Sequence, residues 1–128
     1  MAYTHQLNIN VTGAGISQSA SILPTGDTEL AESLIVPIST TNQAAAFAFV
    51  LAKTQLVYIQ CDQPLTIKTN NASSPGNTIT LAAGQPFFWY VGCSWTNLFT
   101  VDVTGLYLSN ASATLPANLT TLVLTNSR

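Results

Sequence analysis

Few side chains in this sequence could carry out chemistry, and they do not group into a catalytic or metal-binding set. The only histidine, His5, lies near the N-terminus, in a segment expected to be a strand or a loose tail. Cys61 and Cys93 lack the flanking signatures of catalytic cysteines, and with one histidine they cannot form a four-ligand zinc site. We therefore expect His5 to be exposed or to contact a partner. The two cysteines are expected to be buried thiols, with a disulfide as the alternative.

Three carboxylates lie close together in the sequence, at Asp27, Glu29 and Glu32. Paired carboxylates can transfer protons or bind calcium. This stretch lacks the glycine and the alternating oxygen ligands of a calcium-binding loop, so it is expected to be a solvated loop. The sequence predicts no catalytic residue, no cofactor and no metal site, and hence no enzyme. A hydrolase is the enzymatic alternative, and it would depend on His5 as its base.

The aromatic residues are concentrated in one short stretch. Successive residues of a strand point to opposite faces, so some of these rings are expected in the core and others on the surface. Those that face away from the core are candidate anchors for another protein, because aromatic residues are enriched at interfaces. A platform on which a sugar stacks is the alternative. The group comprises Phe87, Phe88, Trp89, Tyr90 and Trp95.

Charged residues make up only 6% of the chain, where about 25% is usual. Thr, Ser, Asn and Gln take their place along the whole sequence. A small domain normally stays soluble and monomeric through its surface charge, yet the net charge here is -2. This composition favours a protein whose surface is largely covered by partners in a larger assembly.

The same composition excludes several classes of partner. The only basic residues are Lys53, Lys68 and Arg128, too few to bind nucleic acid or to form a basic membrane-binding face. The longest apolar run, residues 44–52, is too short to span a bilayer. The first residues lack the basic and apolar regions of a secretory signal. We therefore expect assembly in a cytoplasm, with no nucleic-acid or membrane partner.

Short segments rich in strand-forming residues alternate with turn residues along the chain. Residues 44–52 are ambiguous, because their alanines favour a helix, whereas Phe47, Phe49 and Leu51 alternate as in a strand. Pro37 places its segment at a sheet edge or a bulge. Residues 56–61 are apolar on both faces, as in a strand that is covered on both sides. The expected strands are 7–11, 16–23, 30–40, 44–52, 56–61, 65–69, 79–81, 86–91, 98–103, 106–109 and 119–124.

This pattern predicts a single all-β domain over residues 1–128. Its expected form is a jelly-roll-like β-sandwich of antiparallel strands, with a small β-barrel as the alternative. Residues 1–15 are polar and contain glycine, and we expect them either to form an N-terminal arm that reaches a neighbouring subunit or to be an ordinary edge strand.

Two segments, residues 68–89 and 102–109, resemble a stretch in small structural proteins of tailed bacteriophages. Some of those proteins decorate or cement capsids. The resemblance implies a virion protein on the capsid surface that binds and stabilises the shell of the major capsid protein. A homo-oligomer is expected, with a trimer favoured because capsid lattices offer three-fold sites. The alternative is a carbohydrate- or receptor-binding module of a phage tail, which would use Trp89, Tyr90 and Trp95.

Overall fold

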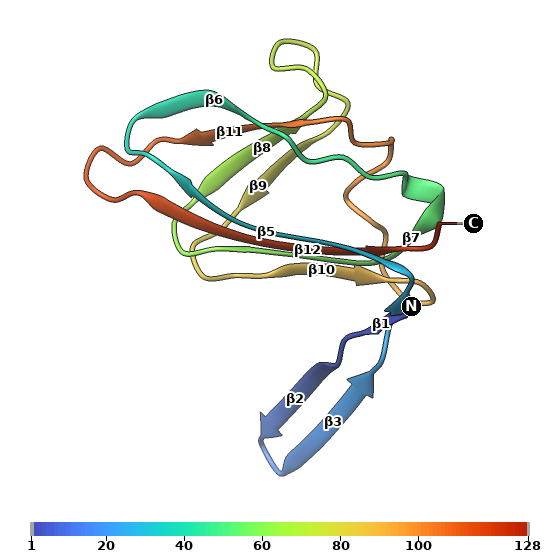
Figure 1. Cartoon of the computed structure of the whole chain (residues 1–128). Helices are drawn as coiled ribbons and strands as arrows, with labels where there is room; N and C mark the ends of the chain where they lie inside the picture. Colours follow the sequence, from blue (N-terminus) through green and yellow to red (C-terminus); the bar gives the residue numbers. More distant parts are fainter. Residues whose placement is uncertain (1, 128) are drawn as a thin grey trace.

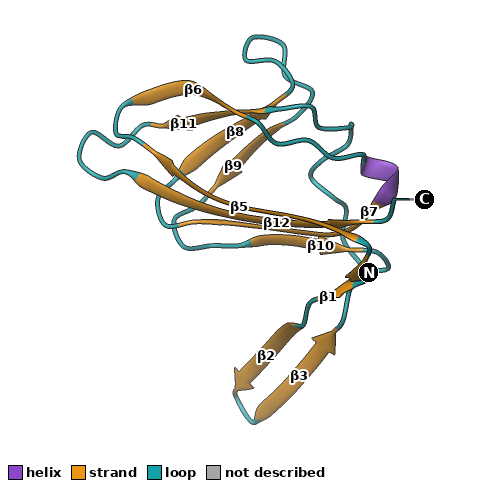
Figure 2. Ribbon diagram, viewed as in Figure 1, coloured by secondary structure: helices purple, strands orange, loops and turns teal. Residues whose placement is uncertain are grey.

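Two four-stranded antiparallel sheets pack face to face in the computed structural model, which describes residues 2–127 (Figures 1 and 2). Met1 and Arg128 lie outside the described residues. Besides strands, the described residues contain a single 3-10 turn, η1 (Leu51–Lys53). The first sheet comprises β5 (Thr28–Val36), β7 (Thr54–Cys61), β10 (Phe87–Tyr90) and β12 (Ala117–Thr125). The second comprises β6 (Thr40–Ala45), β8 (Leu65–Thr69), β9 (Thr78–Leu81) and β11 (Leu106–Asn110).

The eight sandwich strands pair in a nested order. The first, β5, pairs with the last, β12; then β6 pairs with β11, β7 with β10 and β8 with β9. This is the connectivity of one long hairpin rolled into two sheets, which defines a jelly roll. The sheet orders are β10-β7-β12-β5 and β6-β11-β8-β9, and neither sheet closes into a barrel. The predicted jelly-roll-like sandwich is therefore confirmed.

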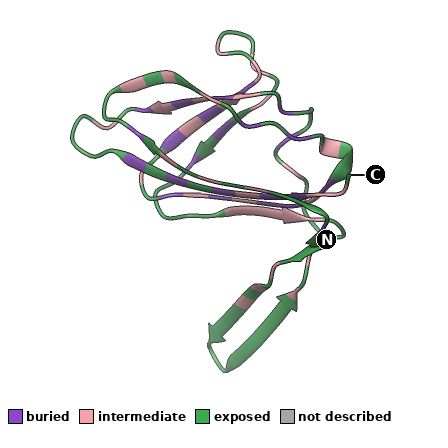
Figure 3. Cartoon of the chain, viewed as in Figure 1, coloured by how far each residue is buried: buried purple, intermediate pink, exposed green. Residues whose placement is uncertain are grey.

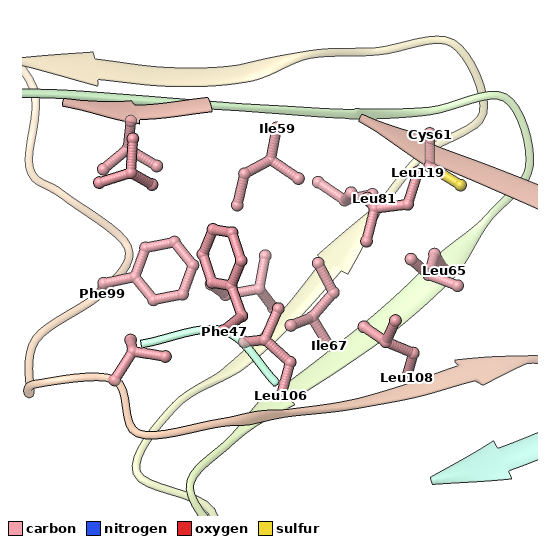
Figure 4. Close-up of a cluster of buried hydrophobic side chains, with 14 of the residues drawn as sticks. Phe47, Ile59, Cys61, Leu65, Ile67, Leu81, Phe99, Leu106, Leu108 and Leu119 are labelled. Carbon is pink, nitrogen blue, oxygen red and sulfur yellow. The ribbon is translucent and has the colours of Figure 1, made fainter. Parts of the chain in front are cut away.

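The core lies between the two sheets and follows from the alternation of side chains along each strand (Figure 4). In β7 the core receives Val57, Ile59 and Cys61, while the residues between them point to the opposite face. Phenyl rings fill one end of the core, where Phe49 and Phe99 meet edge to face with their centroids 5.4 Å apart. Such close packing accounts for most of the stability of a sandwich of this size.

Two predicted strands are wrong. In the segment 44–52, strand β6 ends at Ala45, and Phe49 forms only an isolated bridge with Val103. That bridge is also the only strand-like pairing within residues 98–103. Alternating apolar residues are typical of strands because one face is buried. Here irregular segments bury Phe47, Phe49 and Phe99 at the end of the sandwich without joining a sheet.

A hairpin projects away from the sandwich (Figure 1). Its strands are β2 (Leu7–Gly13) and β3 (Ile16–Ile22), and they pack mainly against each other. The two-residue turn between them has positive φ at Ala14 and Gly15, as a type I′ hairpin turn requires. A short pair, β1 (Tyr3–Thr4) with β4 (Thr25–Gly26), joins this hairpin to the sandwich. We call residues 7–22 the arm; it extends beyond the arm of residues 1–15 predicted from the sequence.

Candidate interaction surface

The aromatic stretch divides between the core and the surface. Phe87 and Trp89 pack against the core, whereas Phe88 and Tyr90 point to the outer side of β10. The chain turns back after β10, where Gly92 has positive φ and the Cys93 N–H donates to the Tyr90 carbonyl. Of the five predicted anchors, Phe88, Tyr90 and Trp95 are thus available to a partner, and their role as anchors stays a prediction.

Trp95 lies across the two outward rings of β10. Its ring meets Phe88 and Tyr90 edge to face, at centroid distances of 5.2 and 5.6 Å. Its Nε1–H donates to the Phe88 carbonyl at 2.7 Å, which fixes the indole in place. The side chain nevertheless stays 40% exposed, so a rigid aromatic group is presented to solvent. Rigid, partly exposed indoles are favourable contact groups because little conformational entropy is lost when they bind.

The outward aromatics continue as an apolar surface across the first sheet. Phe88 lies opposite Tyr58 on β7, and Tyr58 lies opposite Leu122 on β12. Leu122 in turn lies opposite Ala31 on the edge strand β5. A second row joins Tyr90, Leu56 and Leu124. Leu56 and Leu124 are buried in this surface, Ala31 and Trp95 are exposed, and its other residues are half-buried. We call this surface the aromatic face, and it comprises Ala31, Leu56, Tyr58, Phe88, Tyr90, Trp95, Leu122 and Leu124.

Sequence reasoning missed Tyr58 and Leu122 as surface residues of this site. A signal is present in the sequence, because residues 56–61 are apolar on both faces and predict a strand that is covered on both sides. The structure places β7 in the middle of its sheet, between β10 and β12. Leu56 is indeed buried on its outer side, whereas Tyr58 is only half-buried.

The base of the arm sits on the aromatic face. A pocket of about 140 Å³ is lined by Leu7 of the arm and the two polar residues before it, His5 and Gln6, together with Leu56, Tyr58 and Leu122 of the face. A second pocket of about 220 Å³ lies between Ile22 of the arm and Tyr90. Leu7 and Ile22 are cross-strand partners, so they lie on the same face of the arm. That face of the arm and the aromatic face therefore meet at an apolar corner.

The outer face of the second sheet is polar. We call it the threonine face, and its outward residues include Thr66, Lys68, Thr78, Thr80, Tyr107 and Ser109. At its edge is an open hollow of about 330 Å³, lined by Ser39, Thr40, Thr41, Thr66, Ser109, Asn110 and Ala111. Hydroxyl groups dominate this hollow and none of its lining residues is charged. It therefore offers no acid, base or nucleophile–base pair for catalysis.

The candidate chemical residues serve structural roles. His5 Nε2 lies 2.5 Å from Glu29 Oε2, which ties the segment before the arm to β5. Asp27 Oδ1 and Oδ2 accept from the Ser127 N–H and hydroxyl, each at 2.7 Å. These hydrogen bonds lower the pKa of Asp27. The predicted carboxylate loop is wrong, because Glu29 and Glu32 belong to strand β5.

Within residues 2–127 no three acidic, histidine or cysteine side chains are grouped to hold a metal ion. Cys61 is buried and Cys93 half-buried, and both are free thiols, so the alternative of a disulfide is wrong. Burial raises the pKa of the Cys61 thiol. Asp62 accepts from the Asn118 N–H and Nδ2, which lowers its pKa.

Comparison of the chain with models of protein families, with characterised proteins and with solved structures finds no match. In the described part of the chain, no helix has the length and apolar character needed to cross a membrane.

Proposed function

We propose that this chain is a structural virion protein that decorates or cements the capsid of a tailed phage by binding its major capsid protein. The observation that carries the proposal is the presence of two apolar surfaces that the chain itself covers only in part, the aromatic face and the arm, on a nearly uncharged jelly roll. Monomeric soluble proteins rarely leave large apolar patches uncovered, and such patches mark contact sites. The resemblance of residues 68–89 and 102–109 to phage structural proteins supports a virion as this assembly.

Two further arguments support this function. Jelly rolls are common among viral capsid domains, which is an analogy of fold rather than of site. Salt screens contacts between charged groups, whereas apolar contacts are not weakened in this way. A protein that reinforces a shell therefore binds more reliably through apolar contacts. The arm carries no charged residue, and Glu29 at the border of the aromatic face is already paired with His5. Contacts made by these surfaces would therefore depend little on ionic strength.

The test is binding to shells assembled from the major capsid protein of the phage that is proposed to carry this chain. Purified protein is mixed with such shells, and the pellet is analysed after centrifugation and by cryo-microscopy. We expect saturable binding at one class of lattice site and a higher temperature of shell disassembly. Binding should change less than about threefold between roughly 0.1 M and 1 M salt. Shells that bind none of the protein would contradict the proposal.

One observation favours the alternative of a carbohydrate- or receptor-binding module of a phage tail. Trp95 is fixed by its hydrogen bond and stays partly exposed, as a ring that stacks on a sugar must be. Jelly rolls also include lectin domains. A glycan array separates the two functions: binding that is lost in Trp95→Ala but kept in Tyr107→Ala supports the tail module. Absence of binding to any glycan counts against it.

A further inference from the structure

The arm has one apolar face and one polar face. Leu7, Ile9 and Val11 alternate along β2 and lie opposite Ile22, Ala20 and Gln18 of β3. Ile16 extends the same face at the tip, where it lies opposite Gly13. The other face carries only Asn8, Asn10, Thr12, Ser17, Ser19 and Ser21. Such strict alternation is typical of a sheet with one face buried against protein.

Nothing in the same chain buries this apolar face beyond its base. Every residue from 10 to 21 is exposed, which leaves the arm almost uniformly accessible along its length (Figure 3). Val11 is 58% and Ile16 54% exposed, although both are large apolar side chains. An isolated two-stranded hairpin is at best marginally stable in water. A surface to pack on would therefore stabilise the arm.

We propose that the apolar face of the arm packs on the aromatic face of a second copy of this chain. The aromatic face is the matching surface, because it is also mainly apolar and continuous with the corner at the arm base. Its one charged neighbour, Glu29 at the end of the second row, is paired with His5. Each copy then donates one arm and receives another. This exchange covers the apolar face of each arm and part of each aromatic face, and it leaves the rest of the aromatic face for other contacts.

The size of these surfaces is adequate for a specific contact. A pair of seven-residue strands is about 23 Å long and about 10 Å wide, so one arm face covers roughly 230 Å² of flat area. If each copy donates one arm and receives another, the flat contact area on each copy is roughly 500 Å². A two-fold dimer then buries roughly 1,000 Å² in total, which is near the lower limit for a specific interface. Reciprocal exchange gives a two-fold dimer, and donation around a ring gives a trimer.

Sedimentation equilibrium of the full chain tests this proposal, with pairs of variants that differ only in the face they alter. On the arm, Val11→Asp with Ile16→Asp charges the apolar face, and Thr12→Asp with Ser17→Asp charges the polar face of the same hairpin. On the sandwich, Ala31→Asp charges the aromatic face, and Ala44→Asp charges the threonine face. Ala31 and Ala44 are both exposed residues of edge strands, opposite Leu122 and Tyr107 respectively.

We expect the wild-type protein and the two control variants to sediment as a dimer or trimer of the 13.5 kDa chain. The Val11/Ile16 variant and Ala31→Asp should each weaken association at least tenfold, with unchanged thermal unfolding of the sandwich monomer. A wild-type monomer at all concentrations would overturn the proposal, as would equal effects of the test and control variants. This contact does not require a capsid, so failure of shell binding would leave it standing.

Discussion

The outer faces of the two sheets present different chemistry to solvent, although both sheets share one core. Outward side chains of the second sheet are mainly hydroxyl-bearing, and those of the first sheet include a continuous aromatic and aliphatic surface. An antiparallel sheet in a sandwich normally has a polar outer face, because water covers it. The threonine face follows this rule and the aromatic face departs from it.

The difference shows that the outward apolar side chains of this nearly uncharged chain are concentrated on the first sheet and the arm. Trp95, Tyr58 and Leu122 contribute little to the core, which is already filled by the inward residues of both sheets. The contacts proposed above, outside the monomer, would account for their exposure. The arm rises from this face and not from the threonine face, so both uncovered apolar surfaces lie on one side of the molecule (Figure 1).

The largest effect is expected from breaking the core that supports both faces. Phe99→Ala removes a ring that is 1% exposed and packs edge to face on Phe49. The free energy of unfolding should fall by about 3–5 kcal/mol, measured by urea denaturation. Because both sheets depend on this core, both faces should lose protection from hydrogen exchange together. A loss below about 1 kcal/mol would show that the ring is not a core residue.

A smaller effect is expected at Asn110, which lies fully buried beside the hollow of the threonine face. Its Nδ2 donates to the carbonyls of Val36, Pro37 and Leu115, and its Oδ1 accepts from the Ser112 N–H. Asn110→Ala leaves these buried groups unpaired and should cost about 1–3 kcal/mol of unfolding free energy. The exposed Thr41 serves as the control, and Thr41→Ala should stay within about 0.5 kcal/mol of the wild type.

Two substitutions of Trp95 test how firmly its indole is held on the aromatic face. Trp95→Ala removes both edge-to-face contacts and should reduce the unfolding free energy by about 1–1.5 kcal/mol. Trp95→Phe keeps an aromatic ring but removes the hydrogen bond to the Phe88 carbonyl, at a cost of about 0.5–1 kcal/mol. Chemical denaturation of the two variants measures both values. If Trp95→Ala unfolds like the wild type, the indole is not fixed on the face.

The smallest expected effect is a loss of folding stability at low pH. Asp27 and Asp62 each hold one end of β12 by hydrogen bonds, and both have a lowered pKa. A lowered folded pKa gives stability that is present above the unfolded value, here 3.8, and is lost as the pH falls through the folded value. Thermal unfolding between about pH 5 and pH 2 should show this loss. The double variant Asp27→Asn with Asp62→Asn should flatten the curve, and an unchanged curve would contradict the assignment.

The sequence predicted the class of fold because alternation and turn residues are local signals. Strands such as β2 and β8 alternate clearly and are found where expected. Residues 98–103 alternate for another reason, because Phe99 and Val103 enter the core from an irregular segment. The pairing of β2 with β3 could not be recognised as a separate arm. Local alternation in the sequence does not show which apolar strand faces pack into the core and which stay exposed.

The candidate surface could be predicted only in part. The aromatic stretch was visible, but the faces of Phe87 and Phe88 depend on the register of β10 against β7. Tyr58 and Leu122 join the surface only through strand pairing between segments distant in the sequence. Such long-range register is a property of the whole sandwich and is not carried by local patterning.

Site-specific photo-crosslinking tests most directly whether the aromatic face is a protein contact surface. A photoreactive phenylalanine analogue replaces Tyr58 on the aromatic face or Tyr107 on the threonine face, both half-buried tyrosines of interior strands. After irradiation, the linked peptides are identified by mass spectrometry in mixed isotope-labelled protein. The account predicts links from position 58 to residues 7–22 of another chain, and none from position 107. Equal links from both positions, or none between chains from position 58, would contradict it.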